Sequence, residues 1–496
     1  MQQKFLRNLA FLLVLNLLIK PFYILGIDRS VQNTVGADEY GFYFALFSFS
    51  YLFHILLDFG LTSFNNRNIA QNSLLLGKHL PKLLVLKLLL FAVYLLVVFV
   101  GSLIIDYTEE QIILLAFLAI NQFLLSLILY LRSNLSGLHL FKTDSFISVL
   151  DRLLMIVIVG LLLWGNLVDE FKIKYFVYAQ AFSYAITLLV CFILVLRKSE
   201  LNHFRLKFDW PFLVLIFRKS FPFALLVLLM TFYTRIDSVM LERLLPDGKL
   251  QSGIYASAFR LLDAVNHFSY LFAVLLLPIF SRMLKEKKDV KKLVKLSFTL
   301  IMMPAVVFSV GSMFFSSDAM RALYPIHQGE SLVDFAFRQE LSAKVLILLM
   351  SCFVCTSANY IFGTLLTANG NLRELNIIAL SAVAISVLLN LILIPKYQVV
   401  GSAVASLATH VVVMISQILV VLFKMKLPVG FIFPVRFAMF VLGSFLAAIL
   451  ASSIEIGLGQ ALLLFAITTL VVAILVGFFP VRDFVSILIE KDRERS

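Results

Sequence analysis

The sequence predicts an all-α polytopic membrane protein with about fourteen transmembrane helices. The chain of 496 residues is 61% hydrophobic and only 14% charged, whereas soluble globular domains contain roughly 25% charged residues. Apolar runs of about 20 residues recur from end to end, and each is long enough to cross the roughly 30 Å hydrocarbon core of a bilayer. Many runs contain Ser, Tyr, Gly or Asn, so we expect helices with one face toward lipid and the other packed or hydrated.

Fourteen segments fit this pattern. Each is mainly apolar, and polar or charged connections separate it from the next. An even number of crossings places both chain termini on the same side of the membrane. The predicted spans are 8–27, 40–64, 80–105, 111–131, 145–165, 175–196, 220–241, 252–280, 296–315, 345–368, 374–394, 399–423, 432–454 and 459–479.

The distribution of charge predicts the orientation. With the N-terminus in the cytoplasm, most of the 42 Lys and Arg residues fall in inner segments, and acidic residues are more numerous in outer ones. Because Lys and Arg concentrate on the cytoplasmic side, we expect both termini inside. The strongest inner signal is RMLKEKKDVKKLVK (282–295), a topology anchor touching anionic lipid headgroups. The net charge of +13 therefore indicates a membrane partner and no nucleic acid.

The three cysteines, Cys191, Cys352 and Cys355, all lie inside predicted spans. The CFVC sequence at 352–355 lacks a second Cys or His pair at the spacing of a zinc site. We therefore interpret these cysteines as small apolar helix residues. The N-terminal apolar run ends at IDRS without a small-residue cleavage site, so it is not expected to be a cleavable signal.

No soluble domain is expected. The longest outer connection is 316–344, and the longest inner one, 197–219, is basic and lies between spans six and seven. A two-lobed transporter would join its halves there. The predicted parts are an N-terminal lobe of six helices at 1–196, a basic cytoplasmic linker at 197–219, a C-terminal lobe of six helices at 220–423, and two further helices with a cytoplasmic tail at 424–496.

A faint internal repeat relates two regions of the chain. In each, Ile-Asp closes one helix, a polar loop follows, and G-x-Y-x-x-x-F opens the next helix. The copies are GIDRSVQNTVGADEYGFYFALFSF (26–49) and RIDSVMLERLLPDGKLQSGIYASAFRL (235–261), in which Gly41 and Gly253 are equivalent. Internal repeats around a central substrate site are common in transporters.

Polar side chains form stripes within several predicted spans. A charge at the bilayer centre costs about 2.5–3.5 kcal/mol, so such residues are expected to face a bundle interior or a hydrated cavity. The second span presents one continuous helical face that consists of Tyr51, His54, Asp58, Thr62 and Asn65. The eighth span presents another that consists of Ser257, Arg260, Asp263 and His267.

The first and seventh spans contain further charges. Lys20 precedes Pro21, and the proline is expected to kink that helix. In the seventh span, Thr231, Arg235, Ser238 and Glu242 lie along one side. Asp237 is about 200° round the helix from Arg235, so the two side chains are not expected to share a partner.

Two interpretations of these charges remain. They could pair across helices as structural contacts, and Arg260 with Asp263 at i, i+3 is a candidate pair. We favour a hydrated cavity for the set, because the charged stripes concentrate in spans one, two, seven and eight. Snorkelling toward the membrane surface accounts for four charges nearer span ends, Lys87, Asp151, Arg152 and Arg436.

The predicted substrate cavity combines cations, carboxylates and histidines. Such a mixture suits an anionic headgroup held by cations, with carboxylates or histidines available to exchange protons. It does not suit an apolar drug. No cofactor is expected, although coupling to H⁺ or Na⁺ fits this chemistry. The cavity residues are Lys20, His54, Asp58, Arg235, Asp237, Arg260, Asp263 and His267.

Several stretches of the chain resemble bacterial polysaccharide exporters. Residues 35–72 contain V-G-A-D-E-Y-G, an aromatic-rich helix, D-F-G and a short R-x-I-A, in the order of the opening signature of those proteins. Residues 235–282 resemble their helix 7–8 region. Residues 357–376 resemble their helix 10 and its cytoplasmic turn.

The resemblance is to Wzx-type lipid-linked oligosaccharide flippases of the multidrug/oligosaccharidyl-lipid/polysaccharide (MOP) exporter superfamily. It implies two six-helix lobes around a central cavity, here with two extra C-terminal helices, and places Arg235, Asp237, Arg260 and Asp263 in that cavity. It also implies alternating-access transport of undecaprenyl-diphosphate-linked oligosaccharide across the bacterial inner membrane for polysaccharide, O-antigen or lipopolysaccharide biosynthesis. The implied partners are this substrate, membrane lipids and other polysaccharide-assembly proteins.

Three other functions compete with this one. A drug–cation exporter or a peptidoglycan-precursor flippase of the same superfamily would use the same architecture. A membrane glycan polymerase or ligase would be an enzyme and would need a sizeable outer loop. The connection 316–344 contains Arg321, His327 and Glu330 but is short. Since the sequence also lacks a metal motif, a glycine-rich phosphate loop and a nucleophile triad, we interpret the protein as a transporter and not an enzyme.

Overall fold

The computed structural model of the chain describes residues 15–16, 18–72, 75–138, 140–165, 167–198, 210–327, 329–425 and 432–479. These residues form helices and connections without a strand, so the all-α prediction is confirmed. Within them, eleven helices are long and apolar enough to cross a membrane. The start of the first predicted span, linker residues 199–209 and the C-terminal tail lie outside the described residues.

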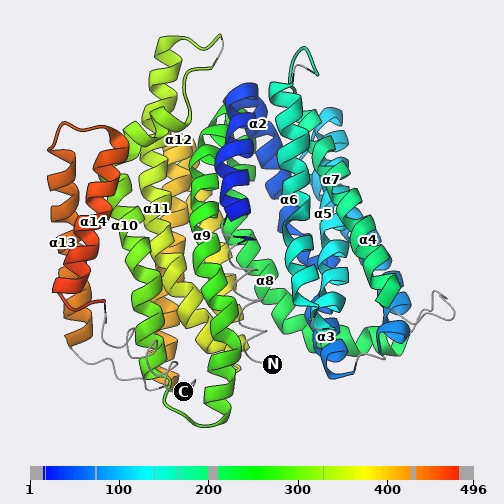
Figure 1. Cartoon of the computed structure of the whole chain (residues 1–496). Coiled ribbons are helices and arrows are strands. Elements are labelled where there is room, and N and C mark those ends of the chain that lie inside the picture. The colour runs from blue at the N-terminus through cyan, green and yellow to red at the C-terminus, as the bar shows by residue number, and fades with distance from the viewer. Residues whose placement is uncertain are drawn as a thin grey trace. The chain divides into compact units, whose positions relative to one another are not determined.

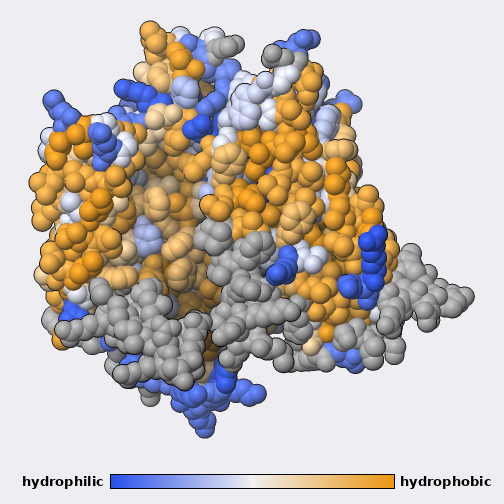
Figure 2. Space-filling model, in the orientation of Figure 1, coloured by the Kyte–Doolittle hydropathy of each residue, from blue (hydrophilic) through white to orange (hydrophobic). Residues whose placement is uncertain are grey.

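The chain falls into two compact units. The first comprises Met1–Ala264 with Val387–Ser402, and the second comprises Val265–Ser386 with Ala403–Ser496. On the face shown in Figure 2, apolar side chains cover much of the helical surface, and hydrophilic ones gather toward helix ends. This pattern is expected for helices in contact with lipid. The predicted lobes at 1–196 and 220–423 remain a prediction.

The first unit is built around α5, which packs against α3, α4, α6 and α7 (Figure 1). A capping box at Thr108 and Gln111 begins α5 by satisfying two free backbone amides. The helices of this unit are η1 (Tyr23–Asp28), α2 (Arg29–Leu52), η2 (His54–Leu57), α3 (Leu61–Gln71), α4 (Leu75–Ile104), α5 (Glu109–Gly137), α6 (Phe141–Trp164), α7 (Ile173–Lys198), α8 (Trp210–Leu244) and the beginning of α9 (Gly248–Lys285).

The second predicted span, 40–64, is not one continuous helix. α2 ends at Leu52, the short 3₁₀-helix η2 follows, and α3 begins at Leu61. Between η2 and α3, Phe59 and Gly60 have φ angles of 45° and 80°, which no right-handed helix contains. The prediction of a single polar stripe along this span is therefore wrong, because its residues belong to three segments with different directions.

Helices α2 and α9 touch at the two equivalent glycines of the internal repeat. A Cβ atom on Gly41 would lie 1.9 Å from the carbonyl oxygen of Lys249, and one on Gly253 would lie 1.9 Å from that of Ala37. Each carbonyl belongs to the residue four positions before the opposite glycine. The repeat therefore encodes a reciprocal backbone crossing, which only residues without a side chain permit.

Substituting alanine for Gly41 is expected to destabilise the fold. Overpacking of this kind costs about 1–3 kcal/mol or more, and here the obstructing atoms belong to the backbone. The thermal unfolding midpoint of purified protein in detergent measures the effect. Gly459→Ala is the matched control, since nothing lies within 4 Å of its added Cβ. Equal midpoints for the two variants would contradict the crossing.

The second unit contains a long antiparallel pair, α10 (Lys291–Leu323) and α11 (Leu332–Ala368), beside the hairpin of α13 (Ile432–Ser452) and α14 (Leu458–Leu475) (Figure 1). Phe440, Phe465 and Phe478 form part of the core where α13 and α14 pack on α10. Both predicted spans 374–394 and 399–423 lie in α12 (Leu372–Met425), which kinks at Gln398. The prediction of about fourteen spans is thus confirmed in outline.

Candidate functional site

The predicted cavity residues divide between the two units. Asp58, Arg235, Asp237, Arg260 and Asp263 all belong to the first unit, as do Lys20 and His54. His267 belongs to the second unit, where its side chain is exposed. These seven residues of the first unit belong to four separate clusters of interacting side chains, which are called groups below.

The first group is an ionic network between α8, α9 and the end of η1. Arg235 Nη2 lies 3.1 Å and 3.2 Å from the two carboxylate oxygens of Asp263. Arg260 Nη1 is 3.9 Å from Asp263, so the predicted i, i+3 pair exists but is long. The shorter contact of Arg260 joins its Nε to Asp28, at 3.1 Å. Asp263 therefore faces two arginines, and Arg260 faces two carboxylates.

Asp28 is a site residue that the sequence analysis missed. Its side chain is 2% exposed, and both of its oxygens accept hydrogen bonds of 3.0 Å from the Tyr40 hydroxyl. Arg260 Nε also donates to that hydroxyl, at 2.9 Å. The repeat contained a signal for this residue, because Asp28 and Asp237 occupy the same Ile-Asp position.

Aromatic rings flank both arginines. The guanidinium carbon of Arg235 lies 5.2 Å from the ring centre of Tyr51 and 4.7 Å from that of Phe259, within the range of cation–π attraction. The His54 ring stacks on Tyr51 at 4.2 Å. Arg235 Nη1 is buried and has no hydrogen-bond partner among the described residues.

Asp237 belongs to a second, separate group. Its side chain is 0% exposed, and it accepts hydrogen bonds of 2.8 Å from Tyr255 and from Asn390. Ser402 in turn donates to Asn390 at 2.9 Å. Asp237 and Arg235 thus have different partners, as their helical spacing predicts. Oxygens of these types suit a hard cation, but the described residues contain no group of three or more His, Cys, Asp or Glu placed to hold a metal ion.

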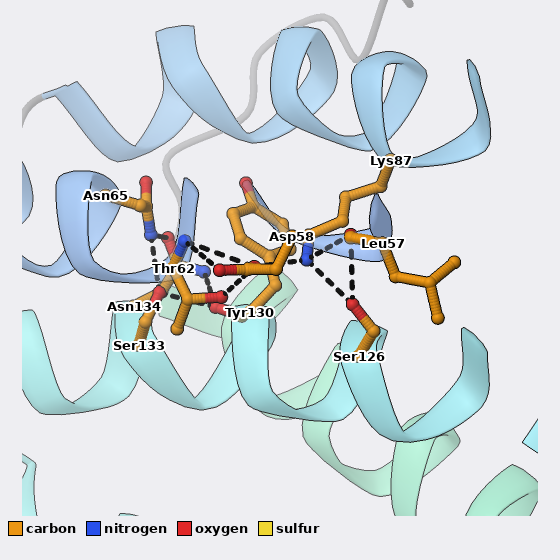
Figure 3. Close-up of polar contacts among 9 residues, drawn as sticks. All are labelled: Leu57, Asp58, Thr62, Asn65, Lys87, Ser126, Tyr130, Ser133 and Asn134. Carbon is orange, nitrogen blue, oxygen red and sulfur yellow. Dashed lines mark hydrogen bonds and ion pairs between the residues drawn. The ribbon is translucent and has the colours of Figure 1, made fainter. Parts of the chain in front are cut away.

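The third group joins Asp58 to Lys87, whose side chains approach to 2.5 Å (Figure 3). Lys87 was expected to snorkel toward the membrane surface, and that prediction is wrong. Its side chain is 0% exposed, and its ammonium group donates to the carbonyl oxygen of Leu57 and the hydroxyl of Ser126. The break after η2 presents that carbonyl to α4, which the sequence pattern did not reveal.

The fourth group surrounds Lys20. Lys20 is half-buried, makes no ion pair with another described residue, and lies within electrostatic range of Arg152 and Asp151. Arg152 packs its guanidinium on the ring of Tyr23, at 4.7 Å, and donates to Tyr184. The snorkelling prediction is therefore wrong for Arg152 as well. Lys20 is therefore near a second cation, Arg152, whose Nε lies 3.7 Å from the Asp151 carboxylate.

The connection between α10 and α11, which was predicted to lie on the outer side, contains the residues considered for an enzyme. Glu330 accepts hydrogen bonds from Arg338, the shortest at 2.7 Å. Although burial opposes its ionisation, hydrogen bonds from Arg338 and from the amide of His327 hold the pKa of Glu330 below its usual range. A carboxylate held in this ionised state is a poor general acid near neutral pH. We therefore interpret the ion pair of Glu330 and Arg338 as structural.

A family model described as "Polysaccharide biosynthesis protein" matches residues 5–284, more than half of the chain. The chain belongs to this family. A comparison with curated proteins finds no significant match. The resemblance seen in the D-F-G and helix 7–8 segments is therefore confirmed by an independent measure.

Several solved structures have the same fold as this chain. The lipid II flippase MurJ in an inward closed conformation has a TM-score of 0.66 at 16% identity, over 93% of this chain and 97% of MurJ. An inward-facing multidrug resistance MATE family transporter of the MOP superfamily has a TM-score of 0.62 at 15% identity, over 85% of this chain and 97% of its own. A mutant MATE transporter from Vibrio cholerae gives 0.56 at 12% identity, over 84% and 96%. The protein is thus a multi-pass polysaccharide-biosynthesis family member with a MOP transporter fold.

Proposed function

We propose that this protein is a flippase that translocates undecaprenyl-diphosphate-linked oligosaccharide across the bacterial inner membrane by alternating access. The polysaccharide-biosynthesis family supports the pathway, and the transporter fold supports the mechanism. In this proposal, the lobes at 1–196 and 220–423 rock about a central cavity, both termini face the cytoplasm, and the product enters O-antigen or a related surface polysaccharide. No covalent bond is made or broken.

The observation that carries the proposal is the free donor on Arg235. The guanidinium of Arg235 is oriented by Asp263 and contacts the rings of Tyr51 and Phe259, while its buried Nη1 has no hydrogen-bond partner among the described residues. In the alternating-access cycle proposed here, this donor becomes available to an acceptor on the substrate when the cavity opens. The planar set of donors of arginine matches the oxygens of phosphate and carboxylate groups, and a diphosphate supplies several such oxygens. Lys20, which is near Arg152 and makes no ion pair among the described residues, is a second cation of the same unit that could contact an anionic group of the substrate. The lipid tail remains in the bilayer.

Reconstitution into liposomes tests the proposal. Liposomes containing the purified protein and a fluorescent undecaprenyl-diphosphate oligosaccharide are expected to expose the sugar to an added impermeant glycosidase much faster than protein-free liposomes. Lipid II and a cationic dye, tested in parallel, represent the peptidoglycan-precursor and drug-exporter alternatives. Transport of either one without transport of the oligosaccharide would replace the proposed substrate.

Deletion of the gene provides the test in cells. Lipid-linked repeat units are expected to accumulate on the cytoplasmic face of the inner membrane, because their synthesis continues while their export stops. Normal surface polysaccharide together with new drug sensitivity would instead identify a drug exporter. Lengthened or shortened polysaccharide with normal export would identify a polymerase or ligase.

A further inference from the structure

The second unit contains uncharged polar side chains on one face of α11. Residues 345–368 of this helix include no Asp, Glu, Lys or Arg, and neither do residues 265–281 of α9 and 403–423 of α12. In this apolar setting, four positions of α11 at spacings of three and four residues fall on one face of the helix. These positions, called the neutral stripe below, are all partly exposed, and they are Thr356, Asn359, Tyr360 and Gly363.

Side chains of α9 and α12 flank the neutral stripe. Asn266 of α9 accepts a hydrogen bond of 2.9 Å from the hydroxyl of Thr356. Gln417 of α12 lies directly over Gly363, because a Cβ atom added to that glycine would meet Gln417 Oε1 at 3.2 Å and Nε2 at 3.5 Å. Three helices of the second unit therefore contribute to one uncharged polar surface.

Two amide oxygens at this surface have no hydrogen-bond partner. Asn359 Oδ1 and Gln417 Oε1 are buried, and neither accepts a hydrogen bond from any residue that the structure describes. Gln417 as a whole is only 6% exposed. An unsatisfied buried acceptor destabilises a fold, and lipid offers no donor to relieve it. A ligand therefore accounts for these two side chains better than packing does.

The missing partner must donate hydrogen bonds. Ionised phosphate and carboxylate groups only accept them, so the anionic part of a lipid-linked substrate cannot satisfy Asn359 Oδ1 or Gln417 Oε1. Sugar hydroxyl groups and acetamido N–H groups are donors, and a hydroxyl also accepts from the amide nitrogens of the same two side chains. The neutral stripe therefore suits the sugars of such a substrate, whereas the arginines of the first unit suit its diphosphate.

Two tyrosines add aromatic surface beside these amides. The ring of Tyr270, which is 52% exposed, lies edge-on to the ring of Tyr360, with 6.3 Å between the ring centres. Tyrosine combines an apolar ring with a polar hydroxyl, and a sugar likewise presents C–H groups on its faces and hydroxyls at its edge. Small-molecule sites typically combine aromatic side chains with a few placed polar groups, and this surface contains both.

We propose that Asn359 and Gln417 form a carbohydrate-binding subsite of the second unit, which recognises hydroxyl and amide groups on the sugars of the oligosaccharide. The inference rests on the proposed flippase function and assigns its sugar specificity to uncharged residues. Neither residue was predicted to contact substrate, because the sequence analysis selected charged side chains and their helical neighbours.

Binding measurements with two lipids test this assignment. The probes are undecaprenyl-diphosphate-linked oligosaccharide and undecaprenyl diphosphate without sugar, each titrated against the full-length protein in detergent. Wild-type protein is expected to bind the glycosylated lipid more tightly than the bare lipid. Gln417→Leu is expected to weaken binding of the glycosylated lipid by about 2- to 10-fold, the typical effect of one neutral hydrogen bond, and to leave binding of the bare lipid unchanged.

Thermal unfolding separates this role from a structural one. Because Gln417 Oε1 has no partner among the described residues, Gln417→Leu should unfold at the wild-type temperature or above it. A side chain that supports the fold would lower the unfolding midpoint when replaced. Thr469→Val is the matched control, because Thr469 is also buried in the second unit but donates to the carbonyl oxygen of Phe465 in its own helix. This control should bind both lipids as wild type does.

The outcomes separate the subsite from the function itself. If wild-type protein binds the glycosylated lipid more tightly but moves none of it in liposomes, the proposed function fails and the subsite stands. If wild type binds neither lipid, both proposals fail. Equal binding of the two lipids by wild type, or equal weakening of both by Gln417→Leu, would refute the subsite. Should Gln417→Leu not fold, Asn359→Leu at a partly exposed position provides a second variant with the same expected loss.

Discussion

Replacing Arg235 with alanine is expected to abolish oligosaccharide transport while the protein still folds and inserts. Its carboxylate partner Asp263 retains a cation, because Arg260 lies 3.9 Å away, so the variant does not leave a bare buried charge. The substrate, by contrast, loses a charged donor in a desolvated site, which costs about 2–5 kcal/mol. Binding should weaken by roughly 30-fold to several thousand-fold.

Titration of the purified variant with the lipid-linked oligosaccharide measures this loss, and its thermal unfolding midpoint reports on folding. Arg235→Lys keeps the charge without the planar set of donors, so it should recover only part of the affinity. Arg282→Ala, at an exposed position on the same chain, is the control for a change in net charge. Wild-type transport by Arg235→Ala would remove this residue from the substrate site.

Arg260→Ala is expected to act mainly on stability. The substitution leaves Asp28 buried without its cation, and removal of one partner from a buried ion pair costs about 3–5 kcal/mol. The sequence placed both arginines in one substrate cavity with equivalent roles. The structure separates them. Among the described residues, Arg235 has a buried donor without a hydrogen-bond partner, whereas the Nε of Arg260 lies against Asp28 and Tyr40.

A double substitution distinguishes this effect from a loss of substrate contacts. Asp28→Asn together with Arg260→Ala removes both charges, so the thermal midpoint should recover most of the difference between Arg260→Ala and wild type. The amount of folded protein extracted from membranes gives an independent measure. If Arg260→Ala melts at the wild-type temperature but cannot transport, the role of Arg260 lies with the substrate and not with Asp28.

The approximate number and positions of the helices were predictable, because the thickness of the bilayer constrains the length of each apolar segment. Hydrocarbon thickness fixes the length of an apolar run, so spans such as 80–105 and 111–131 correspond closely to α4 and α5. The break in the span 40–64 was not predictable from hydropathy, because its residues remain apolar on either side of D-F-G. Gly60 with its positive φ was the local signal, but a glycine within a span is also compatible with close helix packing.

The composition of the site was only partly predictable. Helical periodicity grouped Arg235 with neighbours on its own helix and correctly separated it from Asp237. Periodicity does not report contacts between helices, so it could not join Arg260 to Asp28, which is 232 positions away in the sequence. It also treated Lys87 as a residue near a span end, although the end of η2 supplies a carbonyl and a carboxylate that hold it inside the protein.

The sequence by itself determined that this chain is a membrane protein, roughly how many times it crosses the membrane, and which family it belongs to. These properties depend on hydrophobic length and on local motifs, and both are written in consecutive residues. The tertiary structure alone decided which buried charges are already neutralised and which retain a free donor. That distinction depends on atoms brought within about 3 Å of one another from distant segments, and the cost of an unpaired charge in a low-dielectric interior makes it decisive.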